Sequence, residues 1–502
     1  MPLRAAFYAT LLATLAYRFW LAYALPMTGD EAYFIYWGVY PDYGYYDHPP
    51  MVGWILALML QLSRAAWVLR LPVIVLPALV AFVMLQYLRT ADEAKAYLAA
   101  LAFLLVPVSV WNVLITTDTL LVLFSFLSAL CYAAALRRES RLLYAASGVL
   151  LGLAFLSKYF AVLLALAYLS YVLSQPAGRR SWRGLAITFA GVLPFVGLNA
   201  WWNYNHCWAN LMFNLYNRHG DAGWSPQNPL LYALSVLYML SPVALYQFWR
   251  SRAALAQKLA ETRARLFMLA WVVPLIVFAL LALMKRIGLH WLLSFVPFFF
   301  ITAALLLSAA QLKKSVVYLF AFSAIHVAAT VGASLLPLEV WKGSRHYEGI
   351  VFHVKIAELL QRLEPYAGKY EFSADGFSPA VTASYASGRY FFVFGTASSH
   401  GRQDDILTDF RALAGRNILV LRKNPPNAAD YTPYFANVEL RQFELHGATF
   451  YLVLGQGFDY PRYRDGALRP LRERYYRIPS YLPLAHCYFC ERYFPDEPVP
   501  GR

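Results

Sequence analysis

The chain has 502 residues, of which 60% are hydrophobic and 14% charged, and its formal net charge is +15. This composition excludes an ordinary soluble enzyme and predicts a polytopic membrane protein. Most of the positive charge belongs to residues 1–337, without a basic block or an RNA-binding signature, and therefore points to membrane orientation and anionic lipid rather than nucleic acid.

Apolar runs long enough to cross a bilayer recur through the first 337 residues, and the first of them reads as a retained span rather than a cleaved signal. About eleven spans are predicted, at residues 5–26, 71–88, 96–115, 119–136, 142–157, 160–175, 184–202, 229–249, 266–284, 290–310 and 315–337.

The segments between these runs predict the orientation. With the N-terminus in the cytoplasm, the inside segments hold most of the basic residues, as the positive-inside rule requires. Those segments are 1–4, 89–95, 137–141, 176–183, 250–265 and 311–314. An odd number of spans then puts residues 338–502 in the periplasm.

The first outside loop, residues 27–70, contains the most informative side chains. Asp30 and Glu31 follow the first span directly, and Asp47 and His48 stand before two prolines. Acidic groups are costly beside hydrocarbon and persist there mainly to do chemistry or to pair with a ligand. A solvated loop with an interfacial aromatic belt is the alternative, and it is preferred for the tyrosines alone. The apolar segment 51–63 is too short to span and is expected to form a helix at the membrane surface.

A few basic residues fall at outside-facing ends, where the positive-inside rule predicts scarcity, and are therefore candidates for binding an anion. For Arg64 and Arg70, snorkelling at the interface is the preferred explanation. The full set is Arg18, Arg64, Arg70, Lys158, Arg218, Lys285 and Arg286.

The composition changes at about residue 338. Residues 351–363 have helical periodicity, 417–422 are expected to form a strand, and 437–445 and 448–454 alternate like paired strands around a turn. A small periplasmic α/β or α+β domain is expected. Cys131 reads as a packed thiol, whereas Cys487 and Cys490 form a C-x-x-C pair, for which zinc and a local disulfide both remain open.

Residues 29–37 (GDEAYFIYW) and 44–54 (GYYDHPPMVGW) resemble the GT-C superfamily of integral-membrane glycosyltransferases. Within it the chain looks closest to bacterial relatives of protein O-mannosyltransferases and of the aminoarabinose transferase that modifies lipid A. The resemblance is specific in the first loop, moderate at 117–120 and 157–159, and weak in the tail. O-mannosyltransferases carry His-Pro-Pro-Leu where this chain has HPPM at 48–51, and this departure leaves the sugar and the acceptor undetermined.

The resemblance implies a bacterial inner-membrane enzyme that transfers a sugar from a polyprenyl (undecaprenyl) phosphate donor to a periplasmic envelope acceptor such as lipid A, lipopolysaccharide, another glycan or a protein. Asp30 would be the base of an inverting transfer. Glu31 would assist catalysis by orienting the loop or Asp30 itself; the alternative is that it is an exposed neighbour. Asp118 looks like the second acidic position of the family; a helix N-cap formed by Thr116, Thr117 or Asp118 is the competing explanation.

Three basic residues are expected to bind the donor phosphate, namely Lys158, Lys285 and Arg286, although the last two could also be a simple charge pair at a helix C-terminus. Further substrate contacts are expected from Asp47, His48, Tyr46, Tyr159 and His290. No cofactor is certain, and a divalent metal stays open, with Asp30, Asp118 and His48 as candidate ligands. A transporter or flippase of a lipid-linked anion is the alternative function, but the halves of the sequence show no repeat of the kind that transporters carry.

Overall fold

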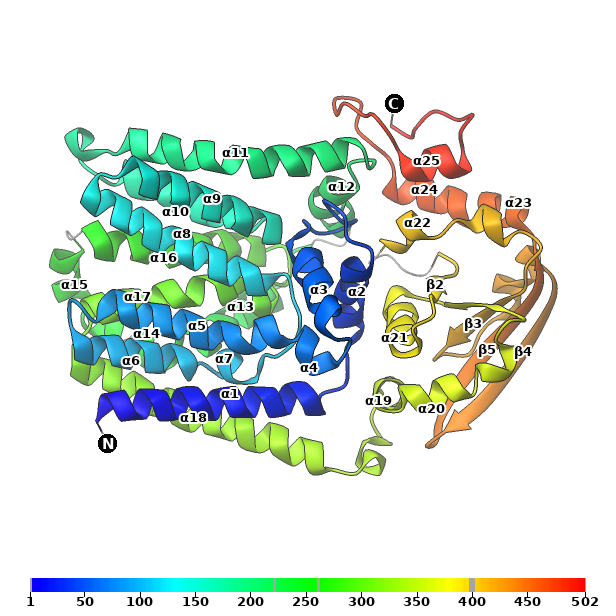
Figure 1. The fold of residues 1–502 in the computed structure, drawn as a ribbon, viewed down its shortest axis with the longest axis horizontal. Helices are drawn as coiled ribbons and strands as arrows, with labels where there is room; N and C mark the ends of the chain where they lie inside the picture. Colours follow the sequence, from blue (N-terminus) through cyan, green and yellow to red (C-terminus); the bar gives the residue numbers. More distant parts are fainter. Residues whose placement is uncertain (1, 220–222, 260–261, 397–401, 502) are drawn as a thin grey trace. The chain divides into compact units, whose positions relative to one another are not determined.

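A computed structural model of the chain describes residues 2–219, 223–259, 262–396 and 402–501 (Figure 1). The chain forms two compact units, each built from three segments. Unit 1 comprises Met1–Leu25, Ser63–Leu198 and Asp221–Leu335; unit 2 comprises Pro26–Leu62, Asn199–Gly220 and Leu336–Arg502. Residues 26–62, most of which belong to the first outside loop, and residues 199–220, most of which lie in the second outside loop between predicted spans 184–202 and 229–249, therefore group with the C-terminal residues.

Unit 1 is a bundle of α-helices, and many of them run side by side in Figure 1. Its helices are α1 (Leu3–Ala24), α4 (Ala66–Leu69), α5 (Leu71–Leu88), α6 (Glu93–Leu104), α7 (Pro107–Trp111), α8 (Asp118–Arg138), α9 (Arg141–Ser157), α10 (Ala161–Leu173), α11 (Trp182–Tyr204, whose last residues belong to unit 2), α13 (Gln227–Leu240), α14 (Pro242–Arg250), α15 (Arg252–Lys258), α16 (Thr262–Ala282), α17 (Val296–Leu306) and α18 (Ala309–Leu335), with the 3-10 helix η3 at Leu289–Phe295.

The described helices include seven that are long and apolar enough to cross a membrane, or eight if the bent pair α13 and α14 is one span. Predicted runs 142–157 and 160–175 correspond to the shorter helices α9 and α10. A polytopic helical membrane fold is thus confirmed, while the number of crossings stays a prediction. The predicted inside segment 250–265 includes residues 260–261, which lie outside the described residues.

Two predicted spans are interrupted at prolines. Run 96–115 divides into α6 and α7 before Pro107, and run 229–249 divides into α13 and α14, which meet at an angle of 89°. Ser241 at the bend has φ 70°, and Pro242 follows it. Proline lacks an N–H group and disfavours the helical conformation of the residue before it, so the helix ends there.

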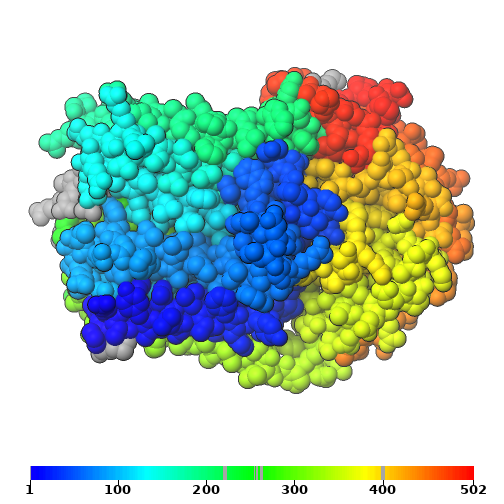
Figure 2. Space-filling view, viewed as in Figure 1, coloured from blue at the N-terminus to red at the C-terminus, as the bar shows by residue number. Residues whose placement is uncertain are grey.

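The centre and the edge of the bundle differ in burial. Of the residues in the apolar stretch formed by η3 and α17, 78% are buried. In α18 only 11% of the apolar stretch is buried, and most residues of the stretches in α1 and α11 are also exposed or partly exposed. In the space-filling view the surfaces of α1 (dark blue) and α11 (green) are uncovered (Figure 2). Apolar side chains on such helices face lipid in a membrane protein, because the bilayer replaces the protein interior.

Close helix packing in unit 1 depends on a glycine. A Cβ atom at Gly148 of α9 would lie 2.1 Å from the Thr188 carbonyl oxygen of α11. Small residues let two helix backbones approach in a membrane, where dispersion rather than water exclusion holds helices together. Alanine at position 148 would therefore push α11 away from α9.

Unit 2 contains a mixed five-stranded sheet of order β2-β1-β3-β5-β4. Strands β2, β1 and β3 are parallel, and β3, β5 and β4 are joined antiparallel. The strands are β1 (Glu371–Ala374), β2 (Phe392–Val393), β3 (Ile418–Arg422), β4 (Phe435–Leu445) and β5 (Ala448–Phe458). Its helices are α2 (Gly29–Val39), α3 (Met51–Leu62), α12 (Ala209–Leu215), α19 (Tyr347–Val354), α20 (Ile356–Gln361), α21 (Phe377–Ser387), α22 (Asp404–Leu407), α23 (Tyr460–Tyr463), α24 (Arg469–Tyr475) and α25 (Tyr488–Tyr493).

The expected hairpin of the C-terminal region is confirmed and is longer than predicted. β4 and β5 each have eleven residues and form the long pair at one edge of the sheet in Figure 1. His446 and Gly447 between them have φ of 51° and 79°. Two consecutive left-handed residues make the tight turn whose twist suits a two-residue hairpin. β1, β2 and α21 were not predicted, because their segments are short and their apolar residues have no clear period.

The first loop is attached to the C-terminal part of unit 2 by helix packing. A Cβ atom at Gly29 of α2 would lie 1.9 Å from the Ser378 Oγ of α21. Any larger side chain at position 29 must therefore separate the two helices. The apolar segment 51–63 is α3, as predicted, and it packs against α2 near Gly38.

The cysteine expectation requires a correction. Cys487 forms a disulfide with Cys207, 280 residues away in sequence, rather than with Cys490, which is a buried free thiol. Cys487 and Cys490 bracket the first turn of α25, whereas the Cys207 backbone N–H donates to the His486 carbonyl oxygen at 3.1 Å. This backbone contact brings Cys207 next to Cys487, so the bridge joins the second outside loop to the C-terminal segment of unit 2.

Candidate functional site

Asp30 lies in the first turn of α2, and the helix start is fixed by its neighbours. The Thr28 Oγ1 accepts from the Glu31 N–H at 3.4 Å, and the Glu31 carboxylate accepts from the Thr28 N–H at 3.2 Å. This reciprocal capping box satisfies two backbone donors at once. Glu31 is fully buried, so the alternative of an exposed neighbour does not hold, whereas Asp30 is exposed at the helix N-terminus, where backbone N–H groups favour a carboxylate.

Asp47 and His48 form the turn before α3. Asp47 is 8% exposed and accepts from the Tyr33 hydroxyl at 3.2 Å, and the His48 Nδ1 lies 3.4 Å from the Asp47 Oδ2. Burial, and then the negative charge of Asp47, raise the pKa of Tyr33 well above its usual range, so that Tyr33 remains a donor. The Asn214 side chain of α12 donates to the Asp47 carbonyl oxygen at 2.9 Å. The turn is therefore held from two sides.

Tyr46 introduces residues that the sequence analysis did not identify. Its backbone N–H donates to the Gln403 Oε1 at 2.8 Å, and its side chain is fully buried. Arg402, next to that glutamine, forms a buried bidentate ion pair with Asp405. No sequence signal indicates the contact between Tyr46 and Gln403, because 357 residues separate the two. Tyr46 is thus fixed within unit 2, and burial raises the pKa of its hydroxyl above the usual range.

Asp118 and Lys158 form a buried ion pair in unit 1. The Lys158 Nζ lies 2.8 Å from both carboxylate oxygens of Asp118, and the two side chains are 7% and 1% exposed. Asp118 is the first residue of α8, and Thr117 before it makes no side-chain capping bond. The N-cap explanation therefore does not account for Asp118, whose carboxylate is directed to Lys158 at the end of α9.

The other predicted phosphate ligands belong to the same unit. The Lys158 ammonium lies 4.8 Å above the Phe160 ring, and Phe160 packs on Trp291 with ring centroids 4.9 Å apart. This contact brings the segment after α16 to the segment after α9. Lys285 is half-buried and Arg286 is exposed in that segment. Tyr159 is also half-buried, and the exposed His290 ring meets Trp291 edge to face.

Two outside-facing arginines, Arg18 and Arg70, bind backbone carbonyl groups. The sequence alone makes Arg18 a candidate for anion binding and favours snorkelling for Arg70. Arg70 is fully buried and donates to the carbonyl oxygens of Ala22 and Leu25, both at 2.8 Å. Snorkelling is therefore wrong for Arg70, which completes the last turn of α1. Arg18 is 2% exposed and donates to the backbone carbonyls of Val73 and Ile74 in α5. Both buried guanidiniums donate to backbone carbonyl oxygens at or near helix ends. The carbonyls at the end of α1 would otherwise be left without a partner in the helix.

The metal question concerns Asp30, Asp118 and His48. Among the described residues, the structure contains no group of three or more His, Cys, Asp or Glu side chains arranged to hold a metal ion. The Lys158 ammonium donates to both carboxylate oxygens of Asp118, so a metal ion bound to that carboxylate would compete with the ammonium. A divalent ion would have to displace that ammonium at Asp118.

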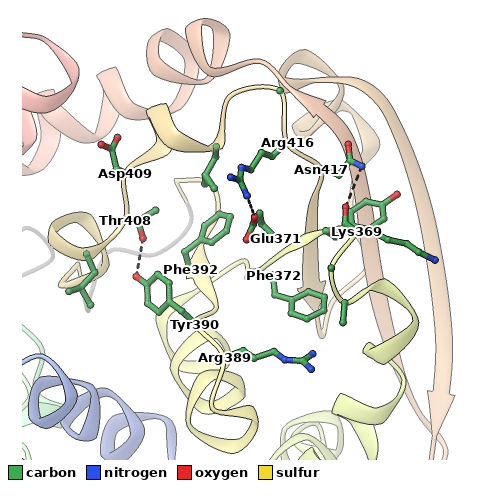
Figure 3. A pocket seen from close by; sticks show the side chains of 16 residues that line it. Lys369, Glu371, Phe372, Arg389, Tyr390, Phe392, Thr408, Asp409, Arg416 and Asn417 are labelled. Carbon is green, nitrogen blue, oxygen red and sulfur yellow. Dashed lines mark hydrogen bonds and ion pairs between the residues drawn. The ribbon is translucent and has the colours of Figure 1, made fainter.

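A large cavity in unit 2 contains none of the predicted site residues. Its volume is about 940 Å³, and it lies where the parallel strands β1, β2 and β3 begin (Figure 3). Arg416 and Glu371 form an ion pair across part of it, and the Tyr390 hydroxyl lies 2.9 Å from the Thr408 hydroxyl. Its charged groups are mostly paired, which leaves little net charge to select a ligand.

Comparison with known proteins connects these features to characterised relatives. A family model described as dolichyl-phosphate-mannose-protein mannosyltransferase matches residues 47–202. The lipid A galacturonosyltransferase RgtD of Rhizobium johnstonii is 30% identical over 181 residues, which are 35% of this chain and 38% of RgtD. The chain thus matches a little over a third of the length of that relative.

Crystal structures of ArnT from Cupriavidus metallidurans cover nearly the whole chain. The apo form aligns with a TM-score of 0.60 at 14% identity, and the form bound to undecaprenyl phosphate with 0.59 at 15% identity. Each alignment covers 89% of this chain and 97% of the ArnT chain. At this identity the likeness establishes the fold. The chain therefore has the fold of ArnT, and the resemblance to the GT-C superfamily of integral-membrane glycosyltransferases is confirmed at the level of the fold.

Proposed function

We propose that this chain transfers a sugar from a polyprenyl phosphate donor, such as undecaprenyl phosphate, to an acceptor of the bacterial envelope. The observation that carries the proposal is Asp30, an exposed carboxylate at a helix start that a buried capping box holds in place. The fold shared with ArnT, which has been crystallised with undecaprenyl phosphate, supports a carrier of that kind. The relative RgtD favours lipid A as the acceptor.

The chemistry that suits Asp30 is removal of the acceptor's proton. The carboxylate takes the hydroxyl proton as the acceptor oxygen forms a bond to the anomeric carbon, and the bond from that carbon to the phosphate oxygen breaks. Polyprenyl phosphate leaves with the electron pair, and the configuration inverts. Phosphate is a competent leaving group when cations stabilise its charge, so no strong general acid is needed.

Lys158, Lys285 and Arg286 are the cations that we propose for the phosphate. All three belong to unit 1, and the Phe160–Trp291 contact brings their segments together. In this proposal the Asp118–Lys158 pair exchanges partners: the ammonium turns from the carboxylate to a phosphate oxygen when the donor binds. Asp47, His48, Tyr159 and His290 are proposed substrate contacts, whereas the buried Tyr46 side chain lies in the core of unit 2.

The proposed setting is the bacterial inner membrane, with a cytoplasmic N-terminus and residues 338–502 in the periplasm. The basic residues of the inside segments support this orientation. The Cys207–Cys487 disulfide supports it independently, because such bonds persist in oxidising compartments and are rare in the cytosol.

Replacing Asp30 with Asn tests the base directly. The amide is nearly isosteric but cannot accept the proton, so the turnover number should fall on the order of 10²-fold or more, with donor binding retained. Glu31→Gln is the matched control, because glutamine also closes a capping box and should cost far less activity. Near-wild-type turnover of Asp30→Asn in saturating donor would exclude Asp30 as the base.

Acceptor and sugar require a separate measurement. Mass spectrometry of lipid A, other glycans and envelope proteins, from cells with and without the chain, should show one sugar-sized mass difference that depends on Asp30. The lipid A fraction is the expected location. A difference confined to protein or to another glycan would reject lipid A as the acceptor while leaving the transfer reaction intact.

A further inference from the structure

Another large cavity lies in unit 1, at the opposite end of α8 from Asp118. Its volume is about 990 Å³, and its lining comes from the ends of α8 and α10, the starts of α9 and α11, and Arg265 of α16. Asp118 begins α8, and the cavity is reached at the other end of that helix. A helix of 21 residues is about 30 Å long, so this cavity is separate from the Asp118–Lys158 pair.

The cavity is strongly basic. Arg141, Arg179, Arg183 and Arg265 line it, against the single acid Glu139. Within the described part of the chain, none of these four arginines forms a salt bridge with a carboxylate. Four guanidiniums around one hollow repel one another, and an anion that binds among them relieves that repulsion.

The inner lining supplies a further donor and a fixed frame. The Nε2 of Gln175 is buried and has no hydrogen-bond partner among the described residues. A buried donor without an acceptor is unfavourable, so an acceptor placed in the cavity would be stabilised. Arg265 donates to the carbonyl oxygens of Ser174 and Leu259, both at 3.1 Å, and thereby fixes the end of α10 beside α16.

Membrane orientation alone does not explain this arrangement. The same loops carry Arg137, Arg138 and Arg180, which do not line the cavity. Arg180 instead donates to the carbonyl oxygens of its own turn, Gln175 at 3.0 Å and Leu173 at 3.4 Å. The positive-inside rule requires basic residues in the loops, but it does not require them to surround a hollow.

The walls indicate what kind of anion fits. Tyr144 and Tyr171, 6% and 2% exposed, lie beside Leu136 and Ile187 in the lining and give it an apolar side next to the arginines. A ligand with compact phosphate charge and an attached apolar part matches both surfaces. Basic pockets between membrane helices on the cytoplasmic side are suited to phospholipid head groups.

We propose that this cavity binds the phosphodiester head group of an anionic phospholipid of the cytoplasmic leaflet. Four guanidiniums suit a head group with two phosphodiesters better than one with a single phosphodiester, because each planar fork grips a pair of oxygens. The leaflet follows from the orientation proposed above, whereas the binding itself depends only on the cavity.

The test uses the full-length purified chain in zwitterionic detergent or phosphatidylcholine nanodiscs. Cardiolipin, phosphatidylglycerol, phosphatidylethanolamine and inorganic phosphate are titrated separately, and binding is followed by native mass spectrometry and by thermal stability. Cardiolipin should bind more tightly than phosphatidylglycerol, and phosphatidylethanolamine and inorganic phosphate should bind weakly. Binding of inorganic phosphate as tightly as cardiolipin would overturn the lipid assignment.

Matched variants locate the lipid. Arg141→Gln and Arg183→Gln should each weaken cardiolipin binding on the order of tenfold, whereas Arg138→Gln and Arg180→Gln, in the same loops, should change it less than about twofold. Equal losses in the lining and the control variants would show a general surface charge effect and reject the cavity.

A further arm separates this proposal from the enzymatic one. Arg141→Gln and Arg183→Gln should leave the affinity for polyprenyl phosphate within about twofold of wild type, because the cavity is about 30 Å from Asp118. If both variants lost carrier binding and cardiolipin binding together, the cavity would not be an independent lipid site. Loss of transfer activity in Asp30→Asn has no bearing on this result.

Discussion

The Asp118–Lys158 pair allows a quantitative test of how unit 1 is held together. The Nζ is 2.8 Å from both carboxylate oxygens, and neither side chain is more than 7% exposed. Removing one partner leaves the other charge buried without its main counter-ion. Asp118→Asn and Lys158→Met should each lower the free energy of unfolding by about 3–5 kcal/mol.

The double variant should be less harmful than the sum of the two single ones. Once one charge is gone, removing the other also removes an unfavourable buried charge. The coupling energy from the double-mutant cycle is expected to be about 2–3 kcal/mol. Unfolding in mixed micelles, followed by circular dichroism, gives the change in the free energy of unfolding for each single variant and for the double variant. A coupling energy below about 0.5 kcal/mol would refute the pairing.

The same variants distinguish a structural pair from one that exchanges partners. If Lys158 turns to the donor phosphate, Lys158→Met weakens binding of sugar-free polyprenyl phosphate, while Asp118→Asn preserves or strengthens it because the ammonium no longer has to leave a carboxylate. Carrier affinity in nanodiscs measures this. Equal weakening by both substitutions would show that the pair has only a structural role.

Three further predictions concern other parts of the molecule. Arg286→Lys should weaken carrier binding almost as much as Arg286→Ala, since lysine loses the planar two-oxygen grip; if lysine restored full affinity in a carrier titration, only the charge would matter. Burial raises the pKa of Asp404 to about 6, and an unfolded aspartate titrates near 4, so the folded chain holds that proton more tightly and loses stability as the pH rises through 6. Asp404→Asn should therefore be more stable than wild type by up to about 3 kcal/mol at pH 8 and equal to it near pH 4. The same difference in thermal stability at pH 8 and at pH 4 would contradict this. Cys207→Ser should lower stability by about 2–5 kcal/mol and remove the reducible link between fragments after proteolysis in the second outside loop; unchanged electrophoretic behaviour of those fragments would exclude the disulfide.

The apolar runs gave the correct helical regions, because length and hydropathy suffice to locate membrane helices. The breaks within these helices were harder to predict. Pro107 and Pro242 are visible in the sequence, but whether a proline kinks a helix, ends it or is tolerated within it depends on which groups satisfy the backbone carbonyls that the proline leaves without a donor. The hairpin at 446–447 was predictable because its turn is local.

Long-range pairings could not be predicted from one sequence. Arg70 completes the turn of α1 from 45 residues away, and Cys207 pairs with Cys487 across 280 residues. Neither residue type nor local spacing indicates such a partner. The Thr28–Glu31 capping box is different, since its three-residue spacing is a recognised helix start, and it would have resolved the two alternatives for Glu31.

The construction of unit 2 from three separate segments constrains how the protein can be recombined with its relatives. A chimera that exchanged only residues 336–502 would place a foreign α21 against the native Gly29, where the packing is so close that an added Cβ atom would lie 1.9 Å from the Ser378 Oγ. The same chimera would leave Cys207 without its disulfide partner Cys487. Exchanging 26–62, 199–220 and 336–502 together keeps these contacts intact. Acceptor preference, if it resides in unit 2, should therefore move between homologues only as this three-part cassette.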